Sequence, residues 1–194
     1  MRVSKSQITA FSLTLLAFGA YLYMRRRSRS SAATPTLIDN TTNSTNMKNY
    51  FGNSEFINST VAKQNGIRNN PDAATWGRIY LLRDNVLNPA REALGQPIYI
   101  TSGYRCPQLN ALVGGASNSQ HVTGEAVDLT TRSLEGNKRL FTILAQMGNF
   151  DQLIWEKGGE WIHVSFTPTP RGEMLAYNGN YYTNINNTWQ NLMA

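Results

Sequence analysis

Two polar side chains lie within segments that are otherwise apolar, and few folds can bury such side chains. Asp128 lies between Val127 and Leu129 in a predicted buried strand, and His163 lies within the apolar stretch 161–166. Burying a carboxylate is costly unless the group is paired or bound to a cation. The pattern therefore predicts a metal ion at Asp128. The alternative is a structural aspartate that is bonded to backbone amides.

The chain has two histidines, His121 and His163, and a single histidine is more often a hydrogen-bonded structural residue than a ligand. Gly124, which lies between His121 and Asp128, permits a sharp turn in the chain. Two imidazoles and one carboxylate suit a catalytic zinc ion, which keeps its fourth position for water. Bound zinc lowers the pKa of that water to about 7. We therefore expect one Zn²⁺ ion held by His121, Asp128 and His163.

Hydrolysis also requires a base that takes a proton from the water and returns it to the leaving amine. Glu160, shortly before His163, is the first candidate, and Glu156, at the other end of a predicted hairpin turn, is the alternative. In a regular strand, residues 160 and 163 point to opposite faces. Glu160 can therefore act as the base only if a bulge, or a turn that ends at Trp161, turns its side chain toward His163. Glu156 would face His163 across the hairpin.

Arg105 follows a short predicted strand through Gly103, in the segment T-S-G-Y-R. This position favours a fixed cation that polarises a scissile carbonyl group or binds a terminal carboxylate. An ordinary ion pair is the alternative. Cys106 is the only cysteine, which excludes an internal disulfide. We expect it to be a small buried side chain, with a place beside the metal as the alternative.

Hydrophobic spacing predicts a mixture of helices and strands. Apolar residues recur at helical spacing from an Asn-Pro-Asp start at residue 70 to Gly95, with a kink or break at Pro89. A second helix is expected between Ser133 as N-cap and Gly148 as stop. Strands are expected at 98–101, 127–129, 150–156 and 161–166, and a short helix at 109–113. This mixture, with a terminal hairpin, indicates an α+β domain.

The formal charge of +6 belongs to the N-terminal region. Six of the 18 basic residues lie in residues 1–30, which hold no acidic residue, so 12 basic residues remain to balance the 12 acidic ones. A neutral domain lacks the basic face that nucleic-acid binding demands. We therefore expect no nucleic-acid partner.

Residues 8–24 form an uncharged, mostly apolar run, at the short end of what crosses a bilayer as a helix. A cleaved signal peptide is the alternative, but no clean small-residue cleavage site follows, and arginines come directly after the run. We expect residues 1–27 to be a single-pass membrane anchor and residues 28–47 a flexible linker. The arginines favour a cytoplasmic C-terminal side. Because Arg2 and Lys5 precede the run, we leave the orientation open.

The candidate site resembles the zinc D-alanyl-D-alanine carboxypeptidase family, which includes vancomycin-resistance dipeptidases and phage endolysin peptidases. The family pattern S-x-H-x-x-G-x-A-x-D is matched in full over residues 119–128. A later E-x-x-H is matched by Glu160 and His163, and an upstream S-G-Y-R by residues 102–105. Family members often have a second histidine two positions after the last ligand, where this chain has Ser165.

The resemblance spans roughly residues 50–170 and implies a fold shared with hedgehog signalling domains, an antiparallel sheet that cradles zinc among surrounding helices. The roles it carries over are zinc ligand for His121, Asp128 and His163, base and acid for Glu160, oxyanion stabiliser for Arg105, and substrate contact for Ser119. In the subgroup with a short hairpin, the glutamate after D-Q-L-I recurs, which keeps Glu156 as the alternative base.

Together these features predict a zinc metallopeptidase that hydrolyses D-alanine-containing stem peptides of peptidoglycan, as a carboxypeptidase or an endolysin-type endopeptidase. The alternatives are a non-catalytic zinc module that binds a wall peptide or a protein, and a structural protein with incidental histidines. We place a monomeric peptidase domain at residues 48–175 and a C-terminal extension at 176–194. The expected location is a membrane, in the cell envelope or, for a phage protein, in the host.

Overall fold

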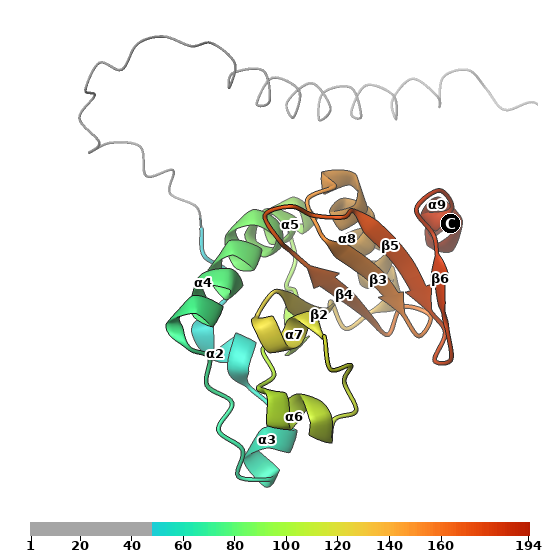
Figure 1. Ribbon diagram of the computed structural model, residues 1–194. Coiled ribbons are helices and arrows are strands. Elements are labelled where there is room, and N and C mark those ends of the chain that lie inside the picture. The colour runs from blue at the N-terminus through green and yellow to red at the C-terminus, as the bar shows by residue number, and fades with distance from the viewer. Residues whose placement is uncertain (1–47) are drawn as a thin grey trace, which may run out of the picture. The chain divides into compact units, whose positions relative to one another are not determined.

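Within residues 48–194, the part of the chain that the computed structural model describes, six strands form one sheet in the order β1-β2-β4-β3-β5-β6 (Figure 1). The strands are β1 (Tyr99–Ser102), β2 (Ala126–Thr130), β3 (Gln152–Glu156), β4 (Trp161–Ser165), β5 (Glu173–Tyr177) and β6 (Tyr182–Asn184). The helices are α2 (Asn53–Ile57), α3 (Thr60–Gln64), α4 (Ala73–Leu82), the π-helical turn η1 (Arg83–Leu87), α5 (Asn88–Leu94), α6 (Pro107–Leu112), α7 (Gln120–Thr123), α8 (Leu134–Met147) and α9 (Trp189–Met193). The predicted α+β class is confirmed.

The sheet is antiparallel at four of its five strand pairs, whereas β3 and β5 run parallel. The expectation of an antiparallel sheet is therefore corrected at this pair. The cause is the path of the chain, because β4 folds back on one side of β3 and residues 166–172 then lead to its other side. Two successive reversals leave β5 pointing in the same direction as β3.

The C-terminal residues continue the same sheet. The sequence predicts that a C-terminal extension begins at residue 176. In the structure β5 runs through this residue, and β6 pairs with β5. α9 packs against α8, with the ring centroids of Phe141 and Trp189 6.3 Å apart. The residues after the β3–β4 hairpin thus add two strands and a helix to the framework.

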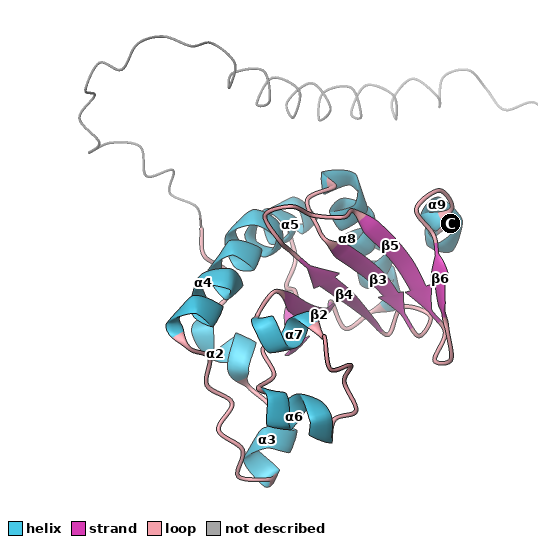
Figure 2. Cartoon of the chain, viewed as in Figure 1, coloured by secondary structure: helices cyan, strands magenta, loops and turns pink. Residues whose placement is uncertain are grey.

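Helix α8 begins and ends where its flanking residues predict. The Ser133 hydroxyl accepts a hydrogen bond from the Gly136 N–H at 3.1 Å, and Gly148 adopts a left-handed φ of 62°. Leu140 and Leu144, one turn apart, are fully buried. Figure 2 shows α8 behind the sheet, and it packs on β3, β4 and α5. The helix therefore covers one face of the sheet.

The first long helix passes through Pro89 without the predicted break. Proline has no N–H, so the carbonyl of Asn85 lacks its usual helical donor. The side-chain amide of Asn149 donates to that carbonyl at 3.1 Å. The π-helical turn η1 lies directly before this point, and the helix runs on to Gly95, where φ is 69°. An external donor and a widened turn thus carry the helix past Pro89 without a break.

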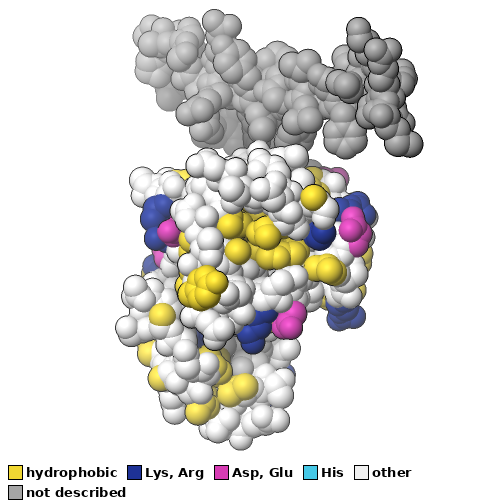
Figure 3. All heavy atoms as spheres, turned by 90° about the vertical axis from the view of Figure 1, so that its right-hand side faces the viewer, with side chains coloured by type: hydrophobic (Ala, Val, Ile, Leu, Met, Phe, Trp, Pro, Cys, Tyr) yellow, Lys and Arg dark blue, Asp and Glu magenta, His cyan; other side chains and the backbone are white. Residues whose placement is uncertain are grey.

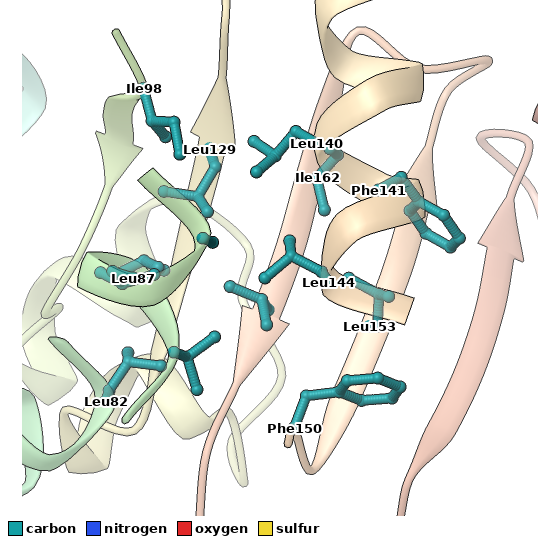
Figure 4. Close-up of a cluster of buried hydrophobic side chains, with 14 of the residues drawn as sticks. Leu82, Leu87, Ile98, Leu129, Leu140, Phe141, Leu144, Phe150, Leu153 and Ile162 are labelled. Atoms are coloured by element: carbon teal, nitrogen blue, oxygen red, sulfur yellow. The ribbon is translucent and has the colours of Figure 1, made fainter. Parts of the chain in front are cut away.

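The strands present one apolar face and one more polar face, which also carries Ile154 and Leu175. Strand side chains on the apolar face pack with Leu140 and Leu144 of α8 in a common core (Figure 4). These strand residues are Val127, Leu129, Leu153, Trp155, Ile162 and Val164. Successive side chains of a strand point to opposite faces. Asp128 and His163, each between two core residues, therefore face away from the core.

No helix within residues 48–194 is long and apolar enough to cross a membrane. The expected anchor, residues 1–27, and the expected linker, residues 28–47, lie outside the described residues.

Candidate metal centre

The structure brings together the three residues that the sequence predicts as ligands. His121 lies on α7, Asp128 on β2 and His163 on β4, and one ligand atom of each lies within 4.8 Å of the other two. Asp128 and His163 are direct partners across the β2–β4 pair. The Asp128 Oδ1 atom lies 3.0 Å from His163 Nδ1 and 3.3 Å from His121 Nε2. The two ring nitrogens are 3.3 Å apart.

A short helix and one glycine place His121 opposite Asp128. α7 begins after Ser119, whose hydroxyl accepts from the His121 N–H, and ends at Gly124, where φ is 78°. A Cβ atom at Gly124 would lie 2.7 Å from the Thr75 methyl carbon. Glycine is therefore required there for both conformation and space. Ser119, the predicted substrate contact, caps α7 and also lines the cavity above the three ligands.

The donor atoms fit a zinc ion. The Nδ1 atom of His121 lies 2.7 Å from the Gly103 carbonyl oxygen, which can only accept, so Nδ1 carries the proton and Nε2 offers its lone pair. Ligand atoms of a tetrahedral zinc ion lie about 3.3 Å apart. The three distances between Nε2 of His121, Oδ1 of Asp128 and Nδ1 of His163 are close to this value.

The protonation states also suit a cation. Burial opposes ionisation of Asp128, but the charges and hydrogen bonds of His121 and His163 outweigh it and hold the pKa of Asp128 well below its ordinary value. Burial lowers the pKa of His121, despite the nearby charge of Asp128. At neutral pH the site therefore holds a carboxylate and a neutral buried imidazole, the forms that bind a metal.

Arg105 lies at the rim of this cluster. Its backbone N–H donates to the His121 carbonyl at 3.1 Å, and its Nη2 atom is 4.0 Å from Asp128 Oδ2. Its buried Nε atom has no hydrogen-bond partner among the described residues. Burial lowers the pKa of Arg105, against the opposing effect of Asp128. A guanidinium with unused donors thus lines the cavity. The neighbouring Cys106 is half-buried and does not belong to the cluster of possible ligands.

The two candidate bases occupy different positions. Glu156 is buried on the polar face of β3 and lines the cavity. It follows Ile154 on that face of the strand, and Ile154 pairs with His163. Glu160 lies in the turn before β4, is exposed and does not line the cavity. Burial raises the pKa of Glu156, His163 lowers it and Asp128 raises it, and the net shift is upward. The geometry favours Glu156.

Comparison with known proteins identifies the family of the chain. A family model described as Peptidase M15 matches residues 49–165. The chain belongs to the peptidase M15 family. This is the zinc D-alanyl-D-alanine carboxypeptidase family that the three motifs resemble. A search of curated proteins finds no match to the chain.

The site of this M15 peptidase includes residues beyond the matched segment that the sequence analysis missed. Arg171, Leu175, Tyr177 and Tyr182 line the cavity together with the metal centre. The signal for the tyrosines was present, because Asn-Gly at residues 178–179 between aromatic residues is typical of a β-hairpin. Nothing local distinguishes Arg171, whose place depends on a distant carboxylate.

That carboxylate, Asp151, forms hydrogen bonds to two segments of the cavity wall of the M15 peptidase. Asp151 is buried and accepts hydrogen bonds from the N–H, Nε and Nη2 of Arg171 at 3.0, 3.1 and 2.6 Å. It also accepts from Gln120 Nε2 at 2.9 Å, directly before the ligand His121. These hydrogen bonds lower the pKa of Asp151. The residue therefore links α7 to the loop before β5.

We expect Asp151→Asn to lower the free energy of unfolding by roughly 1–3 kcal/mol at neutral pH, since it removes charge-assisted hydrogen bonds. A lowered pKa in the folded state stabilises the fold above the unfolded pKa, and this stabilisation is lost as pH falls through the folded value. The difference in the free energy of unfolding between the variant and the wild type should thus be constant above about pH 4 and shrink below it. Urea unfolding across this range measures it, and a pH-independent difference would refute the role of the charge.

Proposed function

We propose that this M15 peptidase hydrolyses D-alanine-containing peptides of the bacterial cell wall, with one zinc ion held by His121, Asp128 and His163. The observation that carries the proposal is the grouping of these three ligand atoms in a cavity that Glu156 and Arg105 also line. A ligand set, a proton carrier and a cation together meet the needs of amide hydrolysis. Zinc, when bound, activates water and polarises a carbonyl group.

The other tasks belong to side chains of the chain itself. Glu156 takes a proton from the attacking water at a carboxylate oxygen and passes it to the nitrogen of the leaving amine. Its burial supports this role, because a desolvated carboxyl group holds a proton more readily than an exposed one. Arg105 donates to the carbonyl oxygen as negative charge develops there. The Gly103 carbonyl keeps the His121 ring oriented, as the outer partner of a metal-binding histidine does.

The test uses the full-length chain, kept in a mild detergent because of its apolar N-terminal run and loaded with one equivalent of zinc. It is incubated with peptidoglycan fragments that contain D-Ala-D-Ala, and products are identified by mass spectrometry. We expect release of D-alanine or cleavage of a crosslink, loss of both on chelation, and recovery with zinc. A folded, zinc-loaded chain that cuts none of these fragments would contradict the proposal and favour the non-catalytic binding module.

A further inference from the structure

The cavity around the ligands has two arms. The larger, of about 770 Å³, runs over the polar face of the sheet toward β5 and β6. The smaller, of about 420 Å³, lies between β1 and the short helices α3 and α6. Both are lined by Arg105, Val113 and Asp128, so they adjoin at Asp128, the candidate ligand that lines both arms. A bond held at the ligands would therefore have open space on either side.

The register of the sheet defines the floor of the larger arm. His163 pairs with Ile154, and Ile154 pairs with Leu175, so an apolar row leads from the metal ligand across β3 to β5. His163, Ile154 and Leu175 all line this arm. Two inter-strand spacings of about 4.8 Å make a floor roughly 10 Å long. About three extended residues fit over that length.

A second row of the same face forms one wall of this arm. Glu156 pairs with Tyr177, and Tyr177 pairs with Tyr182. The two tyrosine rings stack with centroids 4.5 Å apart, and Tyr182 remains 56% exposed. Figure 3, which looks onto the β6 side of the molecule, shows hydrophobic side chains gathered in surface patches. A stacked aromatic pair with one exposed ring, beside the cavity, suits the binding of an extended peptide.

The charges in the arms argue against a site for a chain terminus. Among the described residues that line the two arms, Arg105 and Arg171 are the only Lys or Arg side chains. Arg171 is held by Asp151 and lies 3.5 Å from Glu173, so two carboxylates already neutralise it. Arg105 stands where the arms meet. With Arg105 assigned to the carbonyl oxygen at the cleaved bond, the described lining of the two arms offers no further unpaired cation to a terminal carboxylate, which an enzyme specific for chain ends needs.

We propose that the cleft binds an internal stretch of peptide, with residues on both sides of the cleaved bond, and that Tyr182 on the β5–β6 hairpin holds one of these segments. The protein is accordingly an endopeptidase. This inference rests on the proposed function and narrows it. The hairpin lies after residue 165, where the family match ends, so this specificity would belong to the chain's own C-terminal strands.

Two synthetic peptides with the same D-Ala-D-Ala-containing stem distinguish the outcomes. One ends there with a free carboxylate, and the other continues for three residues and ends in an amide. We expect the zinc-loaded full-length chain to cut the extended peptide internally, with kcat/KM roughly tenfold higher, because filled subsites add binding energy. A ratio at or below one overturns this inference and leaves the proposed function standing. Cleavage of neither peptide overturns both.

Variants of the hairpin test the binding segment separately. Tyr182→Ala should raise KM for the extended peptide roughly tenfold with little change in kcat, since a lost binding contact acts on affinity. Tyr182→Phe should restore KM, because the stacked ring remains. Tyr181→Ala is the matched control, since Tyr181 is 63% exposed and does not line the cavity. Titration calorimetry of the uncut peptide should give the same pattern in Kd, and unchanged values for Tyr182→Ala would exclude the hairpin as a binding arm.

Discussion

His121→Ala is expected to abolish stoichiometric zinc retention, and Asp128→Ala to do the same. The buried His121 imidazole is oriented by Gly103, and Asp128 supplies the negative charge between the two histidines. Loss of either leaves two protein ligands, too few for a tight tetrahedral site. Zinc content after dialysis, measured by elemental analysis, should fall from about one ion per chain to near zero. Activity should fall with it.

Zinc binding is also expected to raise the thermal stability of the folded chain. A ligand that binds the folded chain alone stabilises it by about 4 kcal/mol at a concentration a thousandfold above its Kd. The wild-type Tm should therefore rise on zinc addition and fall on chelation, and the His121→Ala variant should show neither shift. Glu125→Gln, a nearby carboxylate outside the cluster of possible ligands, serves as control and should keep both zinc and its Tm response. One equivalent of zinc in dialysed His121→Ala would refute the ligand assignment.

Glu156→Gln is expected to keep the metal and lose turnover by roughly two to four orders of magnitude, the usual contribution of a general acid–base group. The substitution preserves size and hydrogen-bonding capacity but cannot carry the proton. Because Glu156 is not a ligand, zinc content should match the wild type. Steady-state kinetics on a stem peptide, with zinc measured on the same sample, separates the two effects.

Glu160→Gln is the matched comparison, since Glu156 directly precedes the turn in which Glu160 lies. Glu160 is exposed and lies outside the cavity lining, so its amide variant should stay within about threefold of the wild-type kcat, as surface substitutions away from a site do. The opposite ranking, with Glu160→Gln inactive and Glu156→Gln active, would return the acid–base role to Glu160. Loss of zinc from Glu156→Gln would show instead that this carboxylate supports the metal site.

Features that depend on a few neighbouring residues follow from the sequence. His121 and Asp128 are joined by a segment in which Gly124 makes the turn, and Asp128 and His163 each interrupt an apolar strand. Ser133 and Gly148 mark the two ends of α8 because capping acts within one helical turn. Alternation, capping and turn chemistry operate over short distances. Local sequence was therefore enough to predict these helices and strands. The grouping of His163 with Asp128, 35 positions earlier, was expected instead from the ligand set that zinc requires and from the family motifs.

The positions of Glu156 and Glu160 needed the tertiary structure. Both lie near His163 in sequence, and the path of the turn determines which one points into the cavity. The parallel pairing of β5 with β3 and the contact between Asp151 and Arg171 likewise join residues about 20 positions apart. Such partners are chosen by how the whole chain packs, because each strand edge offers similar hydrogen bonds to any neighbour. The candidate metal ligands could thus be predicted from their motifs, whereas the shape of the cleft around them depended on how the whole chain packs.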